Sequence, residues 1–329
     1  LFPVAGTAWV YYPNDFKTTG ANEWNVNVQR ELGANNVLTV AYVGQKGTHI
    51  FVTDNINEAI PGPGAVAGRR PYPNLGDGTA VGPWANSEYH SLQTTFERRF
   101  SSGLSLLASW TWSHSIDDSS GTGSEGVQTP YDLHLYRGNS TFDVRHNVIL
   151  SWTYELPFGK GKMLLRNAAG PLQWIAGGWQ INSIDTFQTG TPFTVTMLSS
   201  TLNAGSGVQW PNRVASGVLS NSSINQWFDP TAFVAPGAYN YGNSGRNVLF
   251  GPGTRQFDVS MFKSFAFSPD QAMRLQFRAE VFNLLNTPEF NNPNAQIGNL
   301  AVGKITSAGQ PPLFQRTSRE IQLALKLYW

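Results

Sequence analysis

Residues 320–329 have the sequence EIQLALKLYW, in which apolar and other side chains alternate. An alternation with a period of two is the pattern of a β-strand that presents one apolar face. A tilted strand needs about nine to eleven residues to cross a membrane, and this segment is long enough. The apolar set ends on an aromatic residue and consists of Ile321, Leu323, Leu325, Leu327 and Trp329, and the positions between them are Gln322, Ala324, Lys326 and Tyr328.

The same alternation recurs along the chain. It is clear at residues 90–100, 104–113, 145–156 and 273–283. We expect roughly nine strands in all, many of ten or more residues, whereas strands of soluble proteins usually have about five or six. Polar faces that carry charges along their middle suit a water-filled or plugged lumen. The pattern therefore predicts an all-β protein, an antiparallel transmembrane β-barrel.

Short and long connections between these strands alternate along the chain. Short turns on one side and long loops on the other are typical of outer-membrane barrels, with the long loops outside the cell. We therefore expect a periplasmic C-terminus and extracellular long loops. The short or intermediate connections are 33–36, 101–103, 158–176 and 266–272, and the long ones are 53–85, 118–141, 197–252 and 287–317.

Composition narrows the classes of function. Charged residues make up 13% of the 329 residues, about half the usual share of roughly 25%. The net charge is only +1, so the chain has no overall positive electrostatic potential that would favour nucleic-acid binding. The absence of cysteine excludes disulfides, Cys-ligated zinc and Cys nucleophiles. No apolar run reaches about 18 residues, so any membrane crossing must use strands.

An odd number of strands has a topological consequence. If the C-terminus is periplasmic, a nine-stranded chain starts in an extracellular loop. Bacterial single-chain barrels normally have an even number of strands. We therefore expect residues 1–329 to be one partial barrel domain, with the strand that should pair with the last strand missing.

Several stretches resemble the C-terminal barrel of TonB-dependent receptors, specifically the Oar-like group common in acidobacteria. Together they cover nearly the whole chain. They are EWNVNVQRELGANNVLTVAYVGQKGTHI (23–50), FDVRHNVILSWTYELPFGKGK (142–162), GGWQINSIDTFQTGTPFTV (177–195), WFDPTAFVAPG (227–237), GNSGRNVLFGPG (242–253) and FRAEVFNLLNTPEFNNPN (277–294).

The resemblance implies a parent barrel of about 22 strands that is plugged by an N-terminal domain. It implies outer-membrane lipid, the barrel-assembly machinery and the TonB complex as partners, the last through the missing N-terminal region. The C-terminal strand resembles the signal that the assembly machinery recognises, carried by Ile321, Leu323, Leu325, Leu327 and Trp329. We expect the plug and N-terminal domains to be absent from this chain, so uptake of a bulky solute belongs to the parent protein. The alternative is a surface or adhesion barrel that transports nothing.

We predict no catalytic, cofactor or metal site. The five histidines, His49, His90, His114, His134 and His146, lack metal-like spacing and are expected at the rim and in loops. No G-x-S-x-G motif indicates a hydrolase. Trp110, Trp112, Trp152, Trp174 and Trp179 could stack on sugars, but aromatic girdles at the two membrane interfaces explain them better.

Four sets of charged residues can be interpreted from the sequence. Asp117 and Asp118, followed by SSGTGSEG, could bind Ca²⁺, but a solvated loop is the favoured interpretation. Asp143 and Arg145 are expected to pair on the lumen face as part of the wall or as a plug contact. Residues 159–162, GKGK, lack a phosphate-loop frame and suit a basic periplasmic turn. Two basic residues on the apolar face, Arg98 and Lys263, are expected near strand ends, where they can extend to lipid headgroups.

Overall fold

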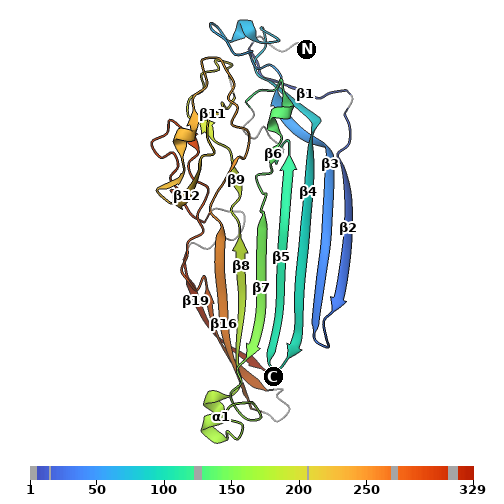
Figure 1. The fold of residues 1–329 in the computed structure, drawn as a ribbon, viewed down its shortest axis with the longest axis vertical. Coiled ribbons are helices and arrows are strands. Elements are labelled where there is room, and N and C mark those ends of the chain that lie inside the picture. Colours follow the sequence, from blue (N-terminus) through green and yellow to red (C-terminus); the bar gives the residue numbers. More distant parts are fainter. Residues whose placement is uncertain (1–5, 15, 122–127, 206, 268–272, 310–317) are drawn as a thin grey trace.

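Nine long strands form one curved sheet in the computed structural model, which describes residues 6–14, 16–121, 128–205, 207–267, 273–309 and 318–329 (Figure 1). Each strand is antiparallel to its neighbours, and the spatial order follows the chain from β2 to β19. The predicted number and arrangement of strands are therefore confirmed. The strands are β2 (Gly20–Glu31), β3 (Asn36–Asn55), β4 (Gly78–Ser101), β5 (Leu104–Asp117), β7 (His146–Glu155), β8 (Trp179–Gln188), β16 (Thr254–Ala266), β17 (Arg274–Phe282) and β19 (Glu320–Tyr328).

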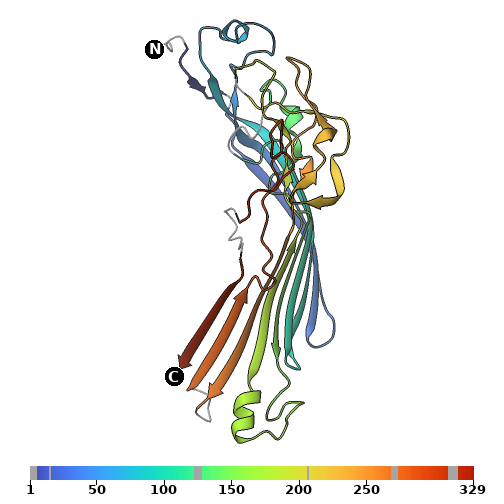
Figure 2. The same cartoon turned by 90° about the vertical axis from the view of Figure 1, so that its left-hand side faces the viewer.

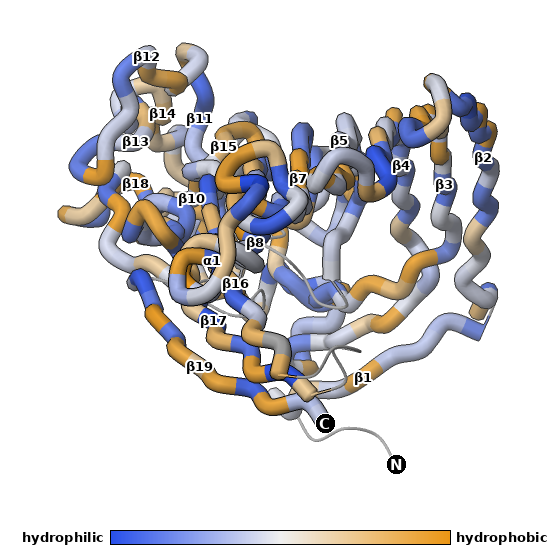
Figure 3. Tube along the Cα trace, turned by 90° about the horizontal axis from the view of Figure 1, so that it is seen from below, coloured by the Kyte–Doolittle hydropathy of each residue, from blue (hydrophilic) through white to orange (hydrophobic). Residues whose placement is uncertain are grey.

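The sheet is an arc rather than a closed barrel. Viewed from below, its strands follow a curve with β2 and β19 at opposite ends (Figure 3). Within the described residues, β2 pairs with β3 and β19 pairs with β17, and neither of these edge strands has a second strand beside it. The backbone groups along both edges are therefore open to further strands.

The connections separate cleanly between the two ends of the sheet (Figures 1 and 2). We call these the loop end and the turn end. The loop end holds β1 (Trp9–Tyr11), β6 (Gly138–Asn139), β9 (Pro192–Phe193), β10 (Thr196–Met197), β11 (Asn212–Arg213), β12 (Val218–Ser223), β13 (Gln226–Phe228), β14 (Phe233–Val234), β15 (Leu249–Phe250), β18 (Gln296–Ile297) and the 3₁₀ turns Ala67–Arg69, Leu133–Tyr136 and Pro230–Ala232, and the turn end holds α1 (Gly170–Ala176). The predicted alternation of short and long connections is confirmed, although parts of 266–272 and 287–317 lie outside the described residues.

The boundaries of the first long connection were wrong. Strand pairing continues through much of the predicted loop 53–85, since Thr53 pairs with Val81 and Asn55 with Thr79. β3 and β4 have 20 and 24 residues, about twice what a membrane crossing requires. The hairpin therefore extends well beyond the bilayer on the loop side. The turn-forming residues in this stretch led the sequence pattern to predict a loop where the strands in fact continue.

Strand register sorts the side chains onto two faces. Leu325 pairs with Phe277, and Phe277 pairs with Lys263, so these side chains share one face. The same register continues across the sheet to Trp24 on β2 and makes this face predominantly apolar, as predicted. The predicted apolar residues of the last strand lie on it and are well exposed, with Leu325 69% exposed. The opposite face carries Gln, Asn, Ser, Thr and charged side chains.

A carboxylate interrupts the apolar face at β8, where the sequence pattern did not reveal it. Register places Ser183 and Asp185 there, beside Trp152. Asp185 is only 8% exposed. It accepts hydrogen bonds from the Trp152 indole at 3.1 Å and from the Ser183 hydroxyl. Because both partners come from the wall itself, this carboxylate is satisfied without water.

The prediction that Lys263 extends to headgroups was wrong. Its side chain is 4% exposed. The ammonium donates to the backbone carbonyl of Gly177 and lies 5.0 Å from the ring centres of both Trp179 and Phe265. A carbonyl and two aromatic faces replace the solvation that headgroups would have supplied. Arg98 is half-buried on the same face, opposite Leu106.

The tryptophans lie mainly where girdles were expected. Trp110 and Trp112 pair with the first residues of β7 near the loop end, and Trp174 and Trp179 lie at the turn end. Trp152 lies further inside β7, where its indole N–H donates a hydrogen bond to Asp185. None of the helices in the described part of the chain is long and apolar enough to cross a membrane.

Candidate functional site: the loop assembly

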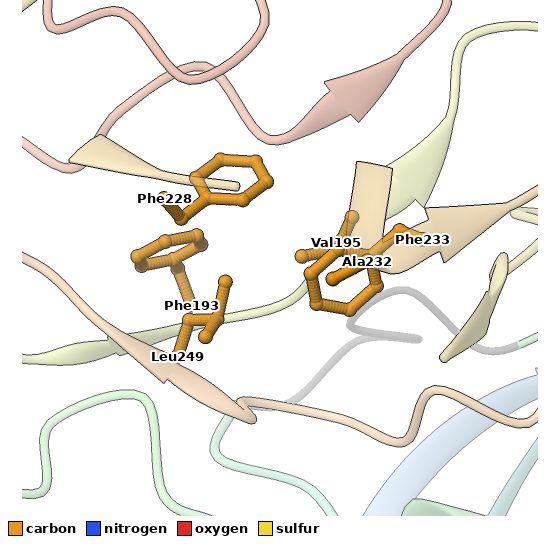
Figure 4. Close-up of a cluster of buried hydrophobic side chains, with 6 residues drawn as sticks. All are labelled: Phe193, Val195, Phe228, Ala232, Phe233 and Leu249. Atoms are coloured by element: carbon orange, nitrogen blue, oxygen red, sulfur yellow. The ribbon is translucent and has the colours of Figure 1, made fainter. Parts of the chain in front are cut away.

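The connections at the loop end pack together into one structure, which we call the loop assembly. It comprises the described residues of 56–77, 118–145, 189–253 and 283–309. Its longest connection, between β8 and β16, folds around an apolar core of its own (Figure 4). The predicted loop 197–252 is therefore far more ordered than its Gly, Asn and Ser content indicated. The core consists of Phe193, Val195, Phe228, Ala232, Phe233 and Leu249.

Arg246 joins the loop assembly to the wall. Its guanidinium, in a side chain 2% exposed, forms an ion pair with the equally buried Asp117 at the end of β5. It also donates to the carbonyl oxygen of Asp117 at 2.6 Å, to that of Tyr136 at 2.8 Å and to the Ser120 hydroxyl at 3.1 Å. The buried charge of Arg246 is well compensated by these partners. If one member of the Arg246–Asp117 pair is removed, the charge of the other stays buried in a low dielectric without a counter-charge.

A second contact between connections involves Trp210, which is 1% exposed. Its backbone N–H donates to the side-chain oxygen of Gln128 at 3.2 Å, and the Gln128 amide donates to Gly242 at 2.8 Å. The Trp210 ring packs edge-on against Tyr136, with 5.8 Å between ring centres. Residues from two distant connections thereby share one buried seam.

A third contact adds the β3–β4 connection. The side-chain amide of Asn203 donates to the carbonyl oxygens of Gly62 and Gly64 at 2.8 and 2.9 Å. Arg69 in turn donates to the carbonyl oxygen of Asn203 at 2.6 Å. The connections 56–77, 118–145 and 189–253 are thus bonded together, so they present a structured surface.

Glu58 is an unusual group within this assembly. Its side chain is buried, and one carboxyl oxygen, Oε1, has no hydrogen-bond partner. Burial raises the pKa of Glu58 to about 8, with added repulsion from Asp54 and Asp77 that Arg70 partly offsets. The carboxyl is therefore mostly protonated at neutral pH.

Two adjoining hollows open where β8 leaves and β16 enters the sheet. One has a volume of about 640 Å³ and brings together Arg145, Arg255, Trp227 and Phe250. The other, of about 660 Å³, is lined by His146, Val148, Phe187 and Phe257. Register places Val148, Phe187 and Phe257 on the predominantly apolar face of the sheet, so the second hollow opens on that face.

The predicted charged pairs have structural partners. Arg145 forms an ion pair with Asp143 at 2.8 Å, as expected, but at the loop end of the wall rather than along the lumen. The two carboxylates considered for Ca²⁺ have other partners, since Asp117 pairs with Arg246 and Asp118 accepts a hydrogen bond from the Asn86 backbone at 2.9 Å. Residues 122–127 of that segment lie outside the described residues. In the part of the chain that the structure describes, no three His, Asp or Glu side chains are grouped to hold a metal.

The histidines on the apolar face lie near the rim. His90 stacks on Tyr42 and shares a 2.8 Å hydrogen bond with its hydroxyl. His146 stacks on Trp110, and His114 bonds to Asn139 at 3.0 Å. These rings extend the aromatic belt and are not assembled as ligands.

The comparison with protein families identifies the fold. The family described as "Outer membrane beta barrel domain" matches residues 1–322. The chain belongs to the outer membrane β-barrel domain family. It is accordingly an outer-membrane protein, and its apolar face is the lipid-facing face.

Solved structures with a similar fold are outer-membrane transporters. The chain matches the transporter YddB from Escherichia coli with 11% identity and a TM-score of 0.56, over 99% of this chain and 35% of that one. It matches the FrpB iron transporter from Neisseria meningitidis with 12% identity and a TM-score of 0.43, over 96% of this chain and 32% of that one. It matches the ferric citrate transporter FecA with 12% identity and a TM-score of 0.42, over 94% of this chain and 31% of that one. No curated protein matches in sequence. The chain thus spans about a third of the length of these transporters.

Replacing Arg246 should open the loop assembly while the barrel wall persists. In Arg246→Met the Asp117 carboxylate stays buried without its cation, which typically costs about 3–5 kcal/mol and raises the open population by about a hundredfold or more. The rate of protease cleavage within 189–253 of the folded protein measures this. Arg213→Met is the matched control, because the Arg213 side chain donates to the nearby carbonyl oxygens of Ala215 and Ser216. Equal cleavage rates in the two variants would contradict the role of Arg246.

Glu58 should make the loop assembly less stable at alkaline pH. The pKa of Glu58 is raised in the folded state. Its contribution to the stability of the loop assembly is therefore fully present below the pKa of the unfolded state, near 4.5, and is lost as the pH rises through about 8. Amide hydrogen exchange of the loop assembly, corrected for intrinsic rates, should show more opening at alkaline than at mildly acidic pH. Glu58→Gln should flatten that dependence, whereas Glu23→Gln on exposed β2 should leave it unchanged. Burial also raises the pKa of Asp54, to about 6, so the contribution of Glu58 is identified by the change above about pH 7. A dependence in that range that survives in Glu58→Gln would contradict the assignment.

Proposed function

We propose that the chain is the C-terminal part of the barrel of a TonB-dependent receptor of the Oar-like group, whose parent protein takes up a bulky solute. The observation that carries the proposal is the open nine-stranded arc. Its free edges call for further strands, and its fold matches about a third of the chain of a larger transporter. In barrels of about 22 strands the lumen is wide enough to hold a plug.

The proposed orientation follows from the two ends of the barrel. The loop end faces outside the cell and the turn end faces the periplasm, because long loops of such barrels are extracellular. The loop assembly would then capture the solute, because its connections form the extracellular surface of the barrel in this orientation.

The lumen wall supplies charges that suit a plug. On the polar face of β17 and β19, Arg274 lies over the Tyr328 ring at 4.4 Å, and Arg278 donates to the Tyr328 hydroxyl at 3.3 Å. Lys326 lies on the same face, 5.0 Å from that ring. Three cations gathered on a lumen wall fit acidic side chains of a plug domain, which the TonB complex would displace to open a path.

The test uses the full-length protein that contains this chain. We expect a plug and a TonB-contacting segment before residue 1, and site-specific crosslinking of that segment to TonB in living cells. Extracellular solute should raise the crosslinking yield by about tenfold, as a coupling of roughly 1–2 kcal/mol would give. A full-length protein without a plug, or one that never contacts TonB, would sink the transport proposal and favour the surface or adhesion barrel, in which loops such as 61–70 bind partners directly.

The proposed assembly signal is the lipid-facing row of β19, closed by Trp329, which is 91% exposed. Deleting Trp329 from the full-length protein should lower the amount of folded, heat-modifiable barrel in the outer membrane several-fold, because the barrel-assembly machinery would lose its aromatic contact. Trp329→Phe should restore assembly, and Lys326→Gln, on the polar face, should not reduce it. Wild-type levels of folded barrel in the deletion would refute the signal.

A further inference from the structure

The connection between β7 and β8, residues 156–178, exposes apolar side chains at the turn end. It contains α1, which lies beneath the strands in Figure 2. Met163 is 80% exposed, Ile175 is 72% exposed and Trp174 is 51% exposed. So much apolar surface on a short connection marks a contact with something other than water.

The connection is folded around its own hydrogen bonds. The Gln173 side chain accepts from the backbone N–H of Lys160 at 2.6 Å, and the Gln173 carbonyl accepts from Gly177 at 2.9 Å. The backbone N–H of Gly159 donates to Leu164 at 3.0 Å. The apolar side chains are thus held outward by a defined backbone.

Contacts fix the connection to the lipid-facing side of the wall. The Trp174 ring packs against Phe265 and Phe267, with 5.6 and 5.9 Å between ring centres. The Trp179 indole donates to the carbonyl of Ile175 at 2.8 Å, and Lys263 donates to that of Gly177. Because Phe265, Trp179 and Lys263 all belong to the lipid-facing face, α1 lies beside the membrane and not beneath the lumen.

The charge of the connection complements an anionic surface. It carries Lys160, Lys162 and Arg166 and no acidic residue. All three are exposed. Lys162 pairs with Glu155 at 2.7 Å. Lys160 and Arg166 flank the apolar side chains as basic residues flank the apolar side of an interfacial helix.

We propose that residues 156–178 are a membrane-surface anchor. The side chains of Met163, Trp174 and Ile175 enter the leaflet at the turn end of the barrel, and Lys160 and Arg166 bind the phosphates of anionic phospholipids there. Lys263, buried against the carbonyl of Gly177 and the rings of Trp179 and Phe265, holds the connection against the wall and leaves the headgroup contacts to the two exposed cations. This anchor is separate from solute uptake and does not depend on it.

Residues 1–329 contain no cysteine, so a single introduced cysteine can report depth once any cysteine elsewhere in the full-length protein is replaced by serine. We would label Ile175→Cys in the full-length protein with an environment-sensitive fluorophore and reconstitute it in vesicles that contain nitroxide lipids. The matched control is Ala34→Cys, in the exposed turn between β2 and β3. Quenching at position 175 should exceed that at position 34 by about twofold or more, as expected for a side chain several ångströms below the headgroups. Equal quenching at the two positions would overturn the proposal.

Charge reversal tests the headgroup contact in the same system. With Lys160→Glu and Arg166→Glu together, quenching at position 175 should fall in phosphatidylglycerol vesicles and stay unchanged in pure phosphatidylcholine. Heat-modifiability confirms that each variant is a folded barrel. Equal quenching in both lipids before and after the reversal would refute the anionic-lipid contact. Quenching at position 175 that is absent in vesicles, with fluorophore shielding only after a periplasmic extract is added, would assign the surface to a soluble protein instead.

Discussion

The hydrocarbon interior of a membrane offers no hydrogen-bond partners, and the rest of this structure depends on that constraint. Every backbone N–H and C=O within the bilayer must be paired by the protein itself. The nine antiparallel strands of the sheet pair these groups with one another. Each strand from β3 to β17 has a hydrogen-bonded neighbour on both sides. At β2 and β19 the pairing stops, so both edges require partners that the described residues do not supply.

The same rule governs the polar side chains on the lipid-facing face. Asp185 is acceptable there because Trp152 and Ser183 donate to it. Lys263 is acceptable because a carbonyl and two aromatic rings enclose its ammonium. A basic residue that faces lipid costs about 2–4 kcal/mol at the bilayer midplane but roughly 0–1 kcal/mol near the interface, and Lys263 lies close to the turn end. Asp185 and Lys263 therefore each have a partner from a neighbouring strand or turn.

Outside the membrane, water can hydrogen-bond the backbone, so the connections need not form strands. The connections at the two ends of the sheet differ accordingly. At the loop end, long connections gather around an apolar core and the Arg246–Asp117 ion pair to form a structured surface. At the turn end, connections stay short except 156–178, which turns its apolar side chains outward beside the wall. One end presents a structured surface of packed connections, and the other stays close to the wall of strands.

The sequence by itself determined the strands, the lipid-facing row that ends at Trp329 and the division into long and short connections. Those features depend on side-chain alternation and turn residues, which are local. Only the tertiary structure decided the facing of β8, where Ile184 points to the polar face and Asp185 to the lipid. Only it joined Arg246 to Asp117, which lies 129 residues earlier in the chain. It also placed α1 beside the membrane and not under the lumen. A buried ion pair and a wall contact depend on which distant strands become neighbours, and no periodicity within one segment carries that information.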